Sequence, residues 1–370
     1  MLRILAVLIV FLPLNTMVGI RIRKSLSIEK TKSKTIFWIL FTLISFSYII
    51  AQILSLILPY PIAKIIFNIG CLYLGAFVYM LFLFAISFFL THIFKNGKLD
   101  YYSISVLLSI IITAYGFCCQ NTTEIKNYDV QVDSQMENNS SIKVALVSDI
   151  HLGCTFSKAH LDKMITEIND LGPDVIIIAG DLIDSDLDVA LKEDDLTNLS
   201  NLKSTYGTFF VLGNHDCYAG QTEKLTNILR ENNVTVLNDD YKLINDSFYI
   251  IGRVDPSITR FSTDSNISER NSLNNIISDI DKSKPTLVID HSPNNIEDSI
   301  ENNIDLQVSG HTHNGQLFPF NFIVSKTSPI GYGYKKINNT NIIVSSGYGT
   351  WGPPIRTNGH SEIALIDIHN

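Results

Sequence analysis

Acidic side chains are almost missing from the first third of this 370-residue chain. Residues 1–120 contain 2 Asp and Glu against 10 Lys and Arg, whereas the rest of the chain contains 34 against 18. The first part therefore carries a net charge of +8 and the remainder −16. Because an acidic surface repels the phosphate backbone of nucleic acids, we expect no nucleic-acid partner.

Cysteine is also scarce, with 5 residues in the whole chain. Cys71, Cys118 and Cys119 fall in apolar segments, which leaves Cys154 and Cys217 for the polar part. Two cysteines exclude the dense disulfide framework of a small secreted domain. One bridge between Cys154 and Cys217 in an oxidising compartment stays an open alternative.

Charged residues are rare in four long apolar stretches, at residues 2–20, 36–58, 65–94 and 103–119. Each is near or above the roughly 18 to 20 residues that a helix needs to cross a bilayer. We interpret residues 1–119 as a membrane region of about four transmembrane helices. A cleaved signal peptide is the alternative for the first stretch, but no small-residue cleavage site precedes Arg21. Ionisable groups such as Lys64 and His92 lie only at the ends of the stretches, which argues against a transporter.

The loops between these stretches predict the orientation of the chain. The second loop carries only Lys64, whereas basic residues gather in the first loop (Arg21, Arg23, Lys24, Lys30, Lys32 and Lys34) and in the third (Lys95 and Lys98). Because loops rich in Lys and Arg stay in the cytoplasm, we expect residues 120–370 on the extracytoplasmic side of the cytoplasmic membrane.

The rest of the chain predicts a layered domain. Residues 120–142 are polar and indicate a linker with a short strand near residues 125–132. Residues 143–370 alternate helix-like periods, such as 157–171 and 223–232, with short apolar runs that indicate strands covered on both faces. This alternation favours an α/β or layered α+β fold. The runs are residues 144–148, 175–179, 209–212, 248–251, 286–289, 306–309, 342–345 and 363–368.

Five of these runs are followed directly by side chains that can bind a metal ion. They are Asp149 and His151, then Asp181, then Asn214 with His215 and Asp216, then His291, and last His311 with His313. Singly, each has a structural explanation, such as a loop-capping carboxylate, a turn asparagine or a histidine at the edge of the core. Jointly, they include five of the nine histidines of the chain. Because sites assemble at the carboxyl ends of strands, we expect these residues to converge.

The chemistry of this set indicates two metal ions. Carboxylate, imidazole and amide groups together suit borderline divalent ions such as Mn, Fe or Zn better than Ca. The ligands are too many for one tetrahedral ion, whereas two ions roughly 4 Å apart that share a carboxylate would use them all.

The five blocks, in this order, resemble the signature of the calcineurin-like metallophosphoesterases. The segments "SDIHLG", "GHTHNGQLFPF" and "SSGYGTWGPPIR" resemble the bacterial branch related to YkuE and YaeI, which includes forms with an amino-terminal multi-helix membrane region. The likeness covers roughly residues 121–370. It implies a β-sandwich flanked by helices as the catalytic domain, residues 143–370.

The resemblance also implies roles for single residues. One ion would be held by Asp149, His151 and His313, the other by Asn214, His291 and His311, with Asp181 as the bridge. A hydroxide between the ions would attack phosphorus, His215 would assist the leaving oxygen, and Asp184 would orient His215. Asp216 would brace its loop, and Gly310 would permit a tight turn.

Substrate-binding residues are less well defined by the sequence. Arg253, Arg260, Arg270 and Arg356 are possible phosphate clamps, of which Arg356 fits the branch-like tail best. Ser185 stands where protein phosphatases of the superfamily carry Arg, which makes a phosphoprotein a poor substrate. Tyr348 and Trp351 would floor a pocket, meet the membrane interface or only pack.

These observations predict a membrane-anchored dimetal phosphoesterase, a hydrolase of phosphomonoester, phosphodiester or pyrophosphate bonds. The membrane anchor favours a lipid-linked phosphate or an envelope precursor as the substrate. The alternative is a non-catalytic, membrane-tethered scaffold that uses the same fold. Retention of Asp181 and His215 argues against that alternative.

Overall fold

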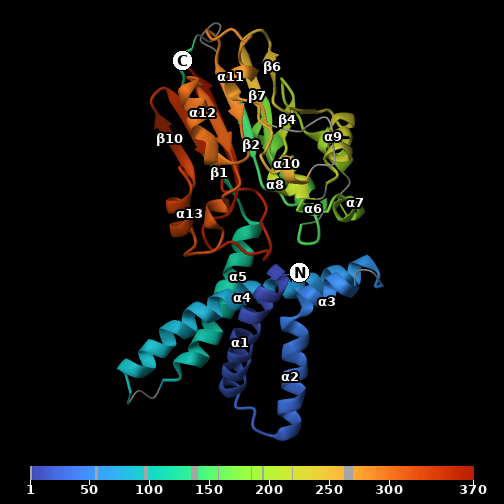
Figure 1. Ribbon diagram of the computed structural model, residues 1–370, viewed down its shortest axis with the longest axis vertical. Helices are drawn as coiled ribbons and strands as arrows, with labels where there is room; N and C mark the ends of the chain where they lie inside the picture. The colour runs from blue at the N-terminus through green and yellow to red at the C-terminus, as the bar shows by residue number, and fades with distance from the viewer. Residues whose placement is uncertain are drawn as a thin grey trace. The chain divides into compact units, whose positions relative to one another are not determined.

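The computed structural model describes residues 2–54, 57–95, 99–134, 141–156, 158–184, 186–193, 196–218, 220–261 and 270–370 (Figure 1). Ser185 and Lys98, which bear on the substrate and on the topology, lie outside the described residues. The chain divides into two compact units. The first comprises Met1–Cys118 with Gly352–Thr357, and the second comprises Cys119–Trp351 with Asn358–Asn370.

The first unit is helical. Its helices are α1 (Leu2–Ser25), α2 (Thr31–Ser45), α3 (Ser47–Leu54), α4 (Tyr60–Ile93) and α5 (Tyr101–Asn121). Aromatic side chains such as Phe41, Tyr73 and Phe77 form its buried core. A Cβ on Gly19 would meet Trp38 and Phe41 of α2, and a Cβ on Gly70 would meet Tyr48 of α3, so these helices pack closely at small residues.

The structure supports two or three of the four expected membrane spans. Among the described residues, α4 and α5 are long and apolar enough to cross a bilayer. The second apolar stretch is broken at Phe46, where α2 ends and the chain bends by 63° into α3. This bent pair adds a third span only if both helices form one crossing.

The second unit contains the strands of the fold. They are β1 (Thr123–Gln131), β2 (Ile142–Val147), β3 (Val175–Ala179), β4 (Thr208–Val211), β5 (Val234–Val236), β6 (Asp240–Ile244), β7 (Phe248–Gly252), β8 (Thr286–Ile289), β9 (Leu306–Ser309), β10 (Gly333–Ile337), β11 (Thr340–Val344) and β12 (Ser361–His369). The helices are α6 (Lys158–Leu171), α7 (Leu187–Glu193), α8 (Asn214–Tyr218), α9 (Thr222–Glu231), α10 (Ile258–Phe261), α11 (Leu273–Ile276), α12 (Ile296–Glu301) and α13 (Asn321–Thr327), with the 3₁₀ turns η2 (Leu196–Asn201), η3 (Pro293–Asn295) and η4 (His313–Gly315).

The described strands form two six-stranded sheets. In the first, the order is β1-β12-β2-β3-β4-β5, and β2 to β5 run parallel. In the second, the order is β10-β11-β9-β8-β7-β6, and the four inner strands run parallel. β1 pairs with β12 along nine residues, so the short strand that we expected near residues 125–132 of the linker belongs to the sheet.

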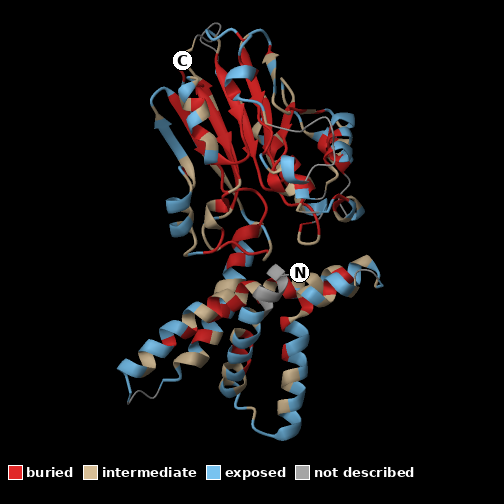
Figure 2. Ribbon diagram, viewed as in Figure 1, coloured by how far each residue is buried: buried red, intermediate tan, exposed pale blue. Residues whose placement is uncertain are grey.

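Apolar side chains fill the space between the two sheets and also cover their outer faces. Leu146 and Phe209 from the first sheet share one buried cluster with Ile289 and Val308 from the second. The other face of the first sheet packs on α6 and α9, and the other face of the second packs on α11 and α12 (Figure 1). Strands covered on both faces are buried along most of their length (Figure 2). The predicted helix-flanked β-sandwich is therefore confirmed.

Candidate metal centre

The predicted ligands follow strands whose carboxyl ends meet. β2, β3 and β4 are parallel neighbours, and the loops after them carry Asp149, Asp181 and Asn214. β8 and β9 are parallel neighbours in the other sheet, and the loops after them carry His291 and His311. These loops come together at the edge of the sandwich, where the N–H of His311 donates to Asp149 of the other sheet.

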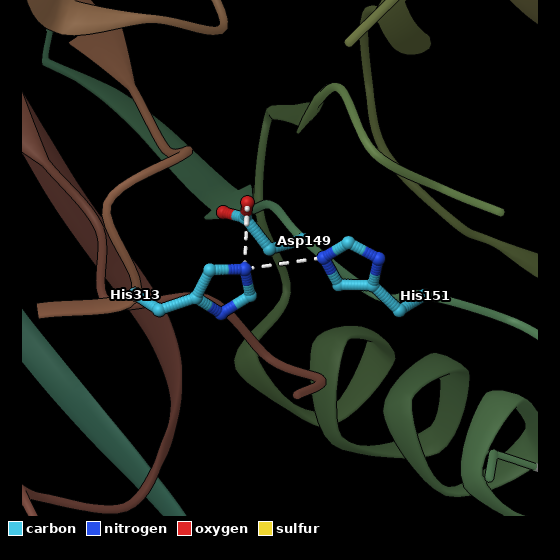
Figure 3. A group of neighbouring side chains, drawn as sticks. All are labelled: Asp149, His151 and His313. Carbon is cyan, nitrogen blue, oxygen red and sulfur yellow. Dashed lines mark hydrogen bonds and ion pairs between the residues drawn. The ribbon is translucent and has the colours of Figure 1, made fainter. Parts of the chain in front are cut away.

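Asp149, His151 and His313 form the first group (Figure 3). Nε2 of His313 lies 3.4 Å from Oδ1 of Asp149 and 3.1 Å from Nε2 of His151. All three side chains are buried, and their ligand atoms lie within 4.8 Å of one another. Two imidazole nitrogens and a carboxylate oxygen that point at one place are a donor set for a divalent ion.

Asp181, His291 and His311 form a second group, and their ligand atoms also lie within 4.8 Å of one another. Oδ1 of Asn214 joins it, 2.8 Å from Nδ1 of His311 and 3.2 Å from Nε2 of His291. The amide nitrogen of Asn214 donates to the hydroxyl of Tyr218 at 2.9 Å, which turns the amide oxygen toward the two imidazoles. We did not predict Tyr218, although its position four residues after Asn214 in α8 was a usable signal.

Asp181 lies between the two groups. Its Oδ2 is 3.2 Å from Nε2 of His291 and 3.9 Å from Nε2 of His151. Its Oδ1 accepts the backbone N–H of His215 at 2.8 Å. A carboxylate shared by two metal ions requires a position of this kind.

Hydrogen bonds outside the two groups fix the ligands. Nδ1 of His291 contacts the backbone oxygen of Ala179 at 2.8 Å; as a donor there, it leaves Nε2 available to a metal. The backbone N–H of His311 donates to the carboxylate of Asp149 at 3.0 Å. Each contact ties one strand-end loop to another.

The backbone of the site is held in an uncommon conformation. Asp149, His151 and Asp181 have φ between 52° and 54°, and His311 and His313 have φ of 71° and 50°. The left-handed region is disfavoured for residues with a Cβ and is retained at functional sites where the surrounding structure enforces it. In this chain it turns consecutive side chains out of the strand direction and into the site.

Two glycines allow the loops to approach. A Cβ on Gly310 would meet Oδ2 of Asp149 and the side chain of Ser148. A Cβ on Gly213 would meet the side chain and backbone nitrogen of Asp181. Only glycine fits at these positions without displacing a candidate ligand.

Electrostatics favour charged carboxylates in the site. Burial alone would raise the pKa of Asp149, but His313 and His291 outweigh burial and lower the pKa. Burial alone would also raise the pKa of Asp181, but His291 outweighs burial and lowers that pKa strongly. Burial and the charge of Asp181 raise the pKa of Asp216 to about 7. The two ligand groups thus contain carboxylates that stay ionised and imidazoles that can exchange a proton for a metal, so the residues fit divalent ions.

His215 lies beside the two groups, within 4.8 Å of ligand atoms of His151 and Asp181. Its Nδ1 hydrogen-bonds the backbone oxygen of Asp184 and lies 3.7 Å from Oδ1 of the same residue. Oδ1 of Asp184 is also 3.5 Å from Nδ1 of His151. The ring of His215 is 6.1 Å from the ring of Trp351, whose side chain is 59% exposed.

The remaining predicted residues fall elsewhere. Tyr348 is buried and its hydroxyl donates to Glu167, so the side chain packs in the core and does not line a pocket. Arg253 contacts Asp239 and Asp298, and Arg270 pairs with Asp290, so both guanidinium groups are used within the protein.

Arg356 belongs to the first unit, where its backbone N–H donates to Gly116. Its expected role in substrate binding stays a prediction. Cys154 and Cys217, both described, are not joined by a disulfide.

Comparisons with known proteins identify the family of this chain. The calcineurin-like phosphoesterase family matches residues 142–315. A metallophosphoesterase of Campylobacter jejuni is 33% identical over 284 residues, which cover 72% of this chain and 68% of that protein. A zebrafish (Danio rerio) transmembrane protein with a metallophosphoesterase domain is 25% identical over 73% of this chain and 63% of its own length. YkuE of Bacillus subtilis is 26% identical over 61% of this chain and 78% of its own length.

The chain belongs to the calcineurin-like metallophosphoesterases, and the predicted family is confirmed. The same matches support a metal-dependent phosphoesterase, as the sequence predicted, and the family implies divalent metal ions. The candidate spans and the transmembrane relatives support association with a membrane. The matches cover about two thirds of the length of the Campylobacter and zebrafish relatives.

Proposed function

We propose that this protein is a membrane-anchored phosphoesterase with two divalent ions. Asp149, His151 and His313 would hold one ion, Asn214, His291 and His311 the other, and Asp181 would bridge them. The observation that carries this proposal is the position of Asp181, whose Oδ2 lies between His291 and His151. The two ligand groups on either side of it supply the nitrogen and oxygen donors that Mn, Fe or Zn prefer.

The ions, when bound, supply Lewis acidity and lower the pKa of a water molecule. The residues of the chain do the remaining work. His215 gives a proton or a positive charge to the leaving oxygen, and Asp184 orients His215 through the contacts at its Nδ1.

The substrate that we propose is a phosphomonoester, phosphodiester or pyrophosphate, and in particular a lipid-linked or envelope phosphate. The candidate membrane spans α4 and α5 support this choice, because a membrane anchor raises the local concentration of amphiphilic substrates. The basic loops support a multi-pass protein in the cytoplasmic membrane with its catalytic domain on the extracytoplasmic side.

The test uses the full chain in lipid nanodiscs. Metal content is measured by mass spectrometry, and Mn-stimulated hydrolysis is measured with p-nitrophenyl phosphate and bis-p-nitrophenyl phosphate. We expect about two ions per chain, and loss of both metal and activity in Asp181→Ala. Asp279→Ala removes an exposed carboxylate outside the site and serves as the matched control. A parent protein that binds metal but hydrolyses neither ester would favour the non-catalytic scaffold.

A further inference from the structure

An exposed apolar surface lies next to the metal centre. Each of the seven residues of α13 is described, and none is buried (Figure 2). Phe322 and Ile323 of α13 are 58% and 57% exposed, and the nearby Phe318 is 52% exposed. The rings of Phe318 and Phe322 meet edge to face at 5.8 Å. We call Phe318, Phe322 and Ile323 the apolar patch. Single exposed apolar residues are ordinary, but a contiguous group marks an interaction site.

The apolar patch is built directly onto the loop of the candidate ligands. α13 begins eight residues after His313, and Gly315 lies so close to Asn321 that a Cβ there would meet the backbone of α13. On its other side, Val324 contacts Gly331, so this face of α13 is turned toward the domain. Phe322 and Ile323 point away from the domain as a result.

Trp351 connects the apolar patch to the catalytic residues. The side-chain oxygen of Gln316 accepts a hydrogen bond from the backbone N–H of Trp351 at 2.9 Å, and its side-chain nitrogen donates to the backbone oxygen of Trp351 at 3.1 Å. Gln316 is two residues from Phe318, and the ring of Trp351 reaches to 6.1 Å from the ring of His215. Gln316 therefore joins the segment that leads into α13 to the residue whose ring lies beside His215.

The charge around the apolar patch differs from that of the rest of the second unit. Residues 306–361 contain no Asp or Glu but three Lys and one Arg, although residues 121–370 contain 34 acidic residues. Lys326 lies on α13 beside the patch and is exposed, as are Lys335 and Lys336 on β10. Apolar and aromatic residues bordered by lysines are typical of segments that lie in the headgroup region of a membrane.

A lipid surface is also the occupant that the rest of the chain favours. α4 and α5 are long and apolar enough to span a bilayer, so the second unit is tethered next to one. Segments that lie in the membrane interface bury tryptophan and phenylalanine there, and Trp351, Phe318 and Phe322 are exposed residues of these kinds.

We propose that the apolar patch and Trp351 insert into the headgroup region of the bilayer and present the phosphate of a lipid to the metal centre. The membrane contact is independent of the chemistry, whereas the lipid substrate rests on the proposed function. The lipid chains stay in the bilayer while the phosphate reaches His215 along Trp351.

Trp351 itself reports on this contact, because the chain has two tryptophans and Trp38→Phe leaves only one. The full-length Trp38→Phe protein is placed in vesicles whose lipids carry bromine close to the headgroup. We expect the emission of Trp351 to fall by about half relative to vesicles without bromine, and iodide in the water to quench it weakly. Adding Phe322→Ser and Ile323→Ser should restore most of the emission, whereas Tyr334→Ser, which alters an exposed aromatic outside the patch, should not.

Two results would overturn the membrane contact. Strong quenching by iodide without quenching by brominated lipid means that Trp351 faces water. Protection from both quenchers means that protein, from the first unit or from a second copy, covers the surface in place of lipid.

The lipid substrate is tested by comparing two esters in the same vesicles, phosphatidic acid in the bilayer and p-nitrophenyl phosphate in the water. We expect Phe322→Ser with Ile323→Ser to lower the ratio of kcat/KM for phosphatidic acid to kcat/KM for p-nitrophenyl phosphate about tenfold, because only hydrolysis of the lipid slows. An unchanged ratio contradicts lipid presentation. Failure of the proposed function looks different, because the parent protein would then hydrolyse neither ester while Trp351 is still quenched by lipid.

Discussion

The carboxylate of Asp216 accepts the backbone N–H of Asp181 at 2.8 Å. The same carboxylate accepts the N–H of Gly213 at 2.8 Å and that of Ile183 at 3.0 Å. Asp216 follows β4 and Asp181 follows β3, so one buried side chain joins two loops of the site. This contact holds Asp181 in its left-handed conformation, with φ of 54°, and sets the direction of the carboxylate between the two ligand groups.

Replacing Asp216 with Asn tests this brace. An amide has one acceptor oxygen, so at least one buried N–H loses its partner, at a cost of about 1 to 3 kcal/mol in stability. Because Asp181 then loses its support, we expect metal affinity to fall about 10- to 100-fold. Thermal unfolding and metal retention through dialysis measure the two effects. Asp279→Asn, an exposed carboxylate, is the control, and unchanged metal retention in Asp216→Asn would show that the brace is dispensable.

His215→Ala should separate catalysis from metal binding. Loss of a general acid costs about 10² to 10⁴ in rate. We expect a loss of that size on an alkyl phosphate and a smaller loss on p-nitrophenyl phosphate, because p-nitrophenolate leaves without a proton. The ions should stay, although His215 lies within 4.8 Å of ligand atoms of His151 and Asp181. If metal content drops in the variant and not in the control His360→Ala, His215 is a ligand.

Most of the fold could be predicted because its inner strands are apolar throughout. All eight apolar runs coincide with β2, β3, β4, β7, β8, β9, β11 and β12, and the two helical periods coincide with α6 and α9. The strands that we missed are β5, β6 and β10, which lie at sheet edges. An edge strand is paired on one side only and tolerates polar residues, as in Lys335 and Lys336 of β10, so its sequence looks like a loop.

The site could be predicted where the signal lay at strand ends, and not where it depended on tertiary contacts. The predicted ligands are brought together in the two groups described above, and Asn214 joins the second group by hydrogen bonds. By contrast, sequence gave no reason to separate Tyr348, which is buried, from Trp351, which is exposed beside His215. The two lie three residues apart in one Gly-rich loop, and only the packing of that loop decides their environments.

Metal binding should depend on pH through His291. Burial alone would lower the pKa of this imidazole, but the charge of Asp181 raises it well above 6.5. The metal-free protein therefore keeps a proton on His291 at neutral pH, and an ion must displace it. With one proton displaced, affinity should rise up to about tenfold per pH unit until the raised pKa is passed. Calorimetric titration with Mn²⁺ in buffers of different ionisation enthalpy counts the released protons. A Kd that is constant between about pH 6 and 8 would contradict this prediction.

Gly310→Ala should remove metal from the first group without unfolding the domain. The new Cβ would meet Oδ2 of Asp149 and the side chain of Ser148, and overpacking of this kind costs about 1 to 3 kcal/mol. Gly172→Ala is the matched control, because Gly172 has φ of 58° and nothing within 4 Å of the new Cβ. There the left-handed backbone alone costs about 1 to 2 kcal/mol. The two variants thus lose similar stability, and only Gly310→Ala should lose close to one ion per chain by mass spectrometry. Equal metal content in both would mean that Asp149 can move aside and still bind, so that the close approach of Gly310 does not position it.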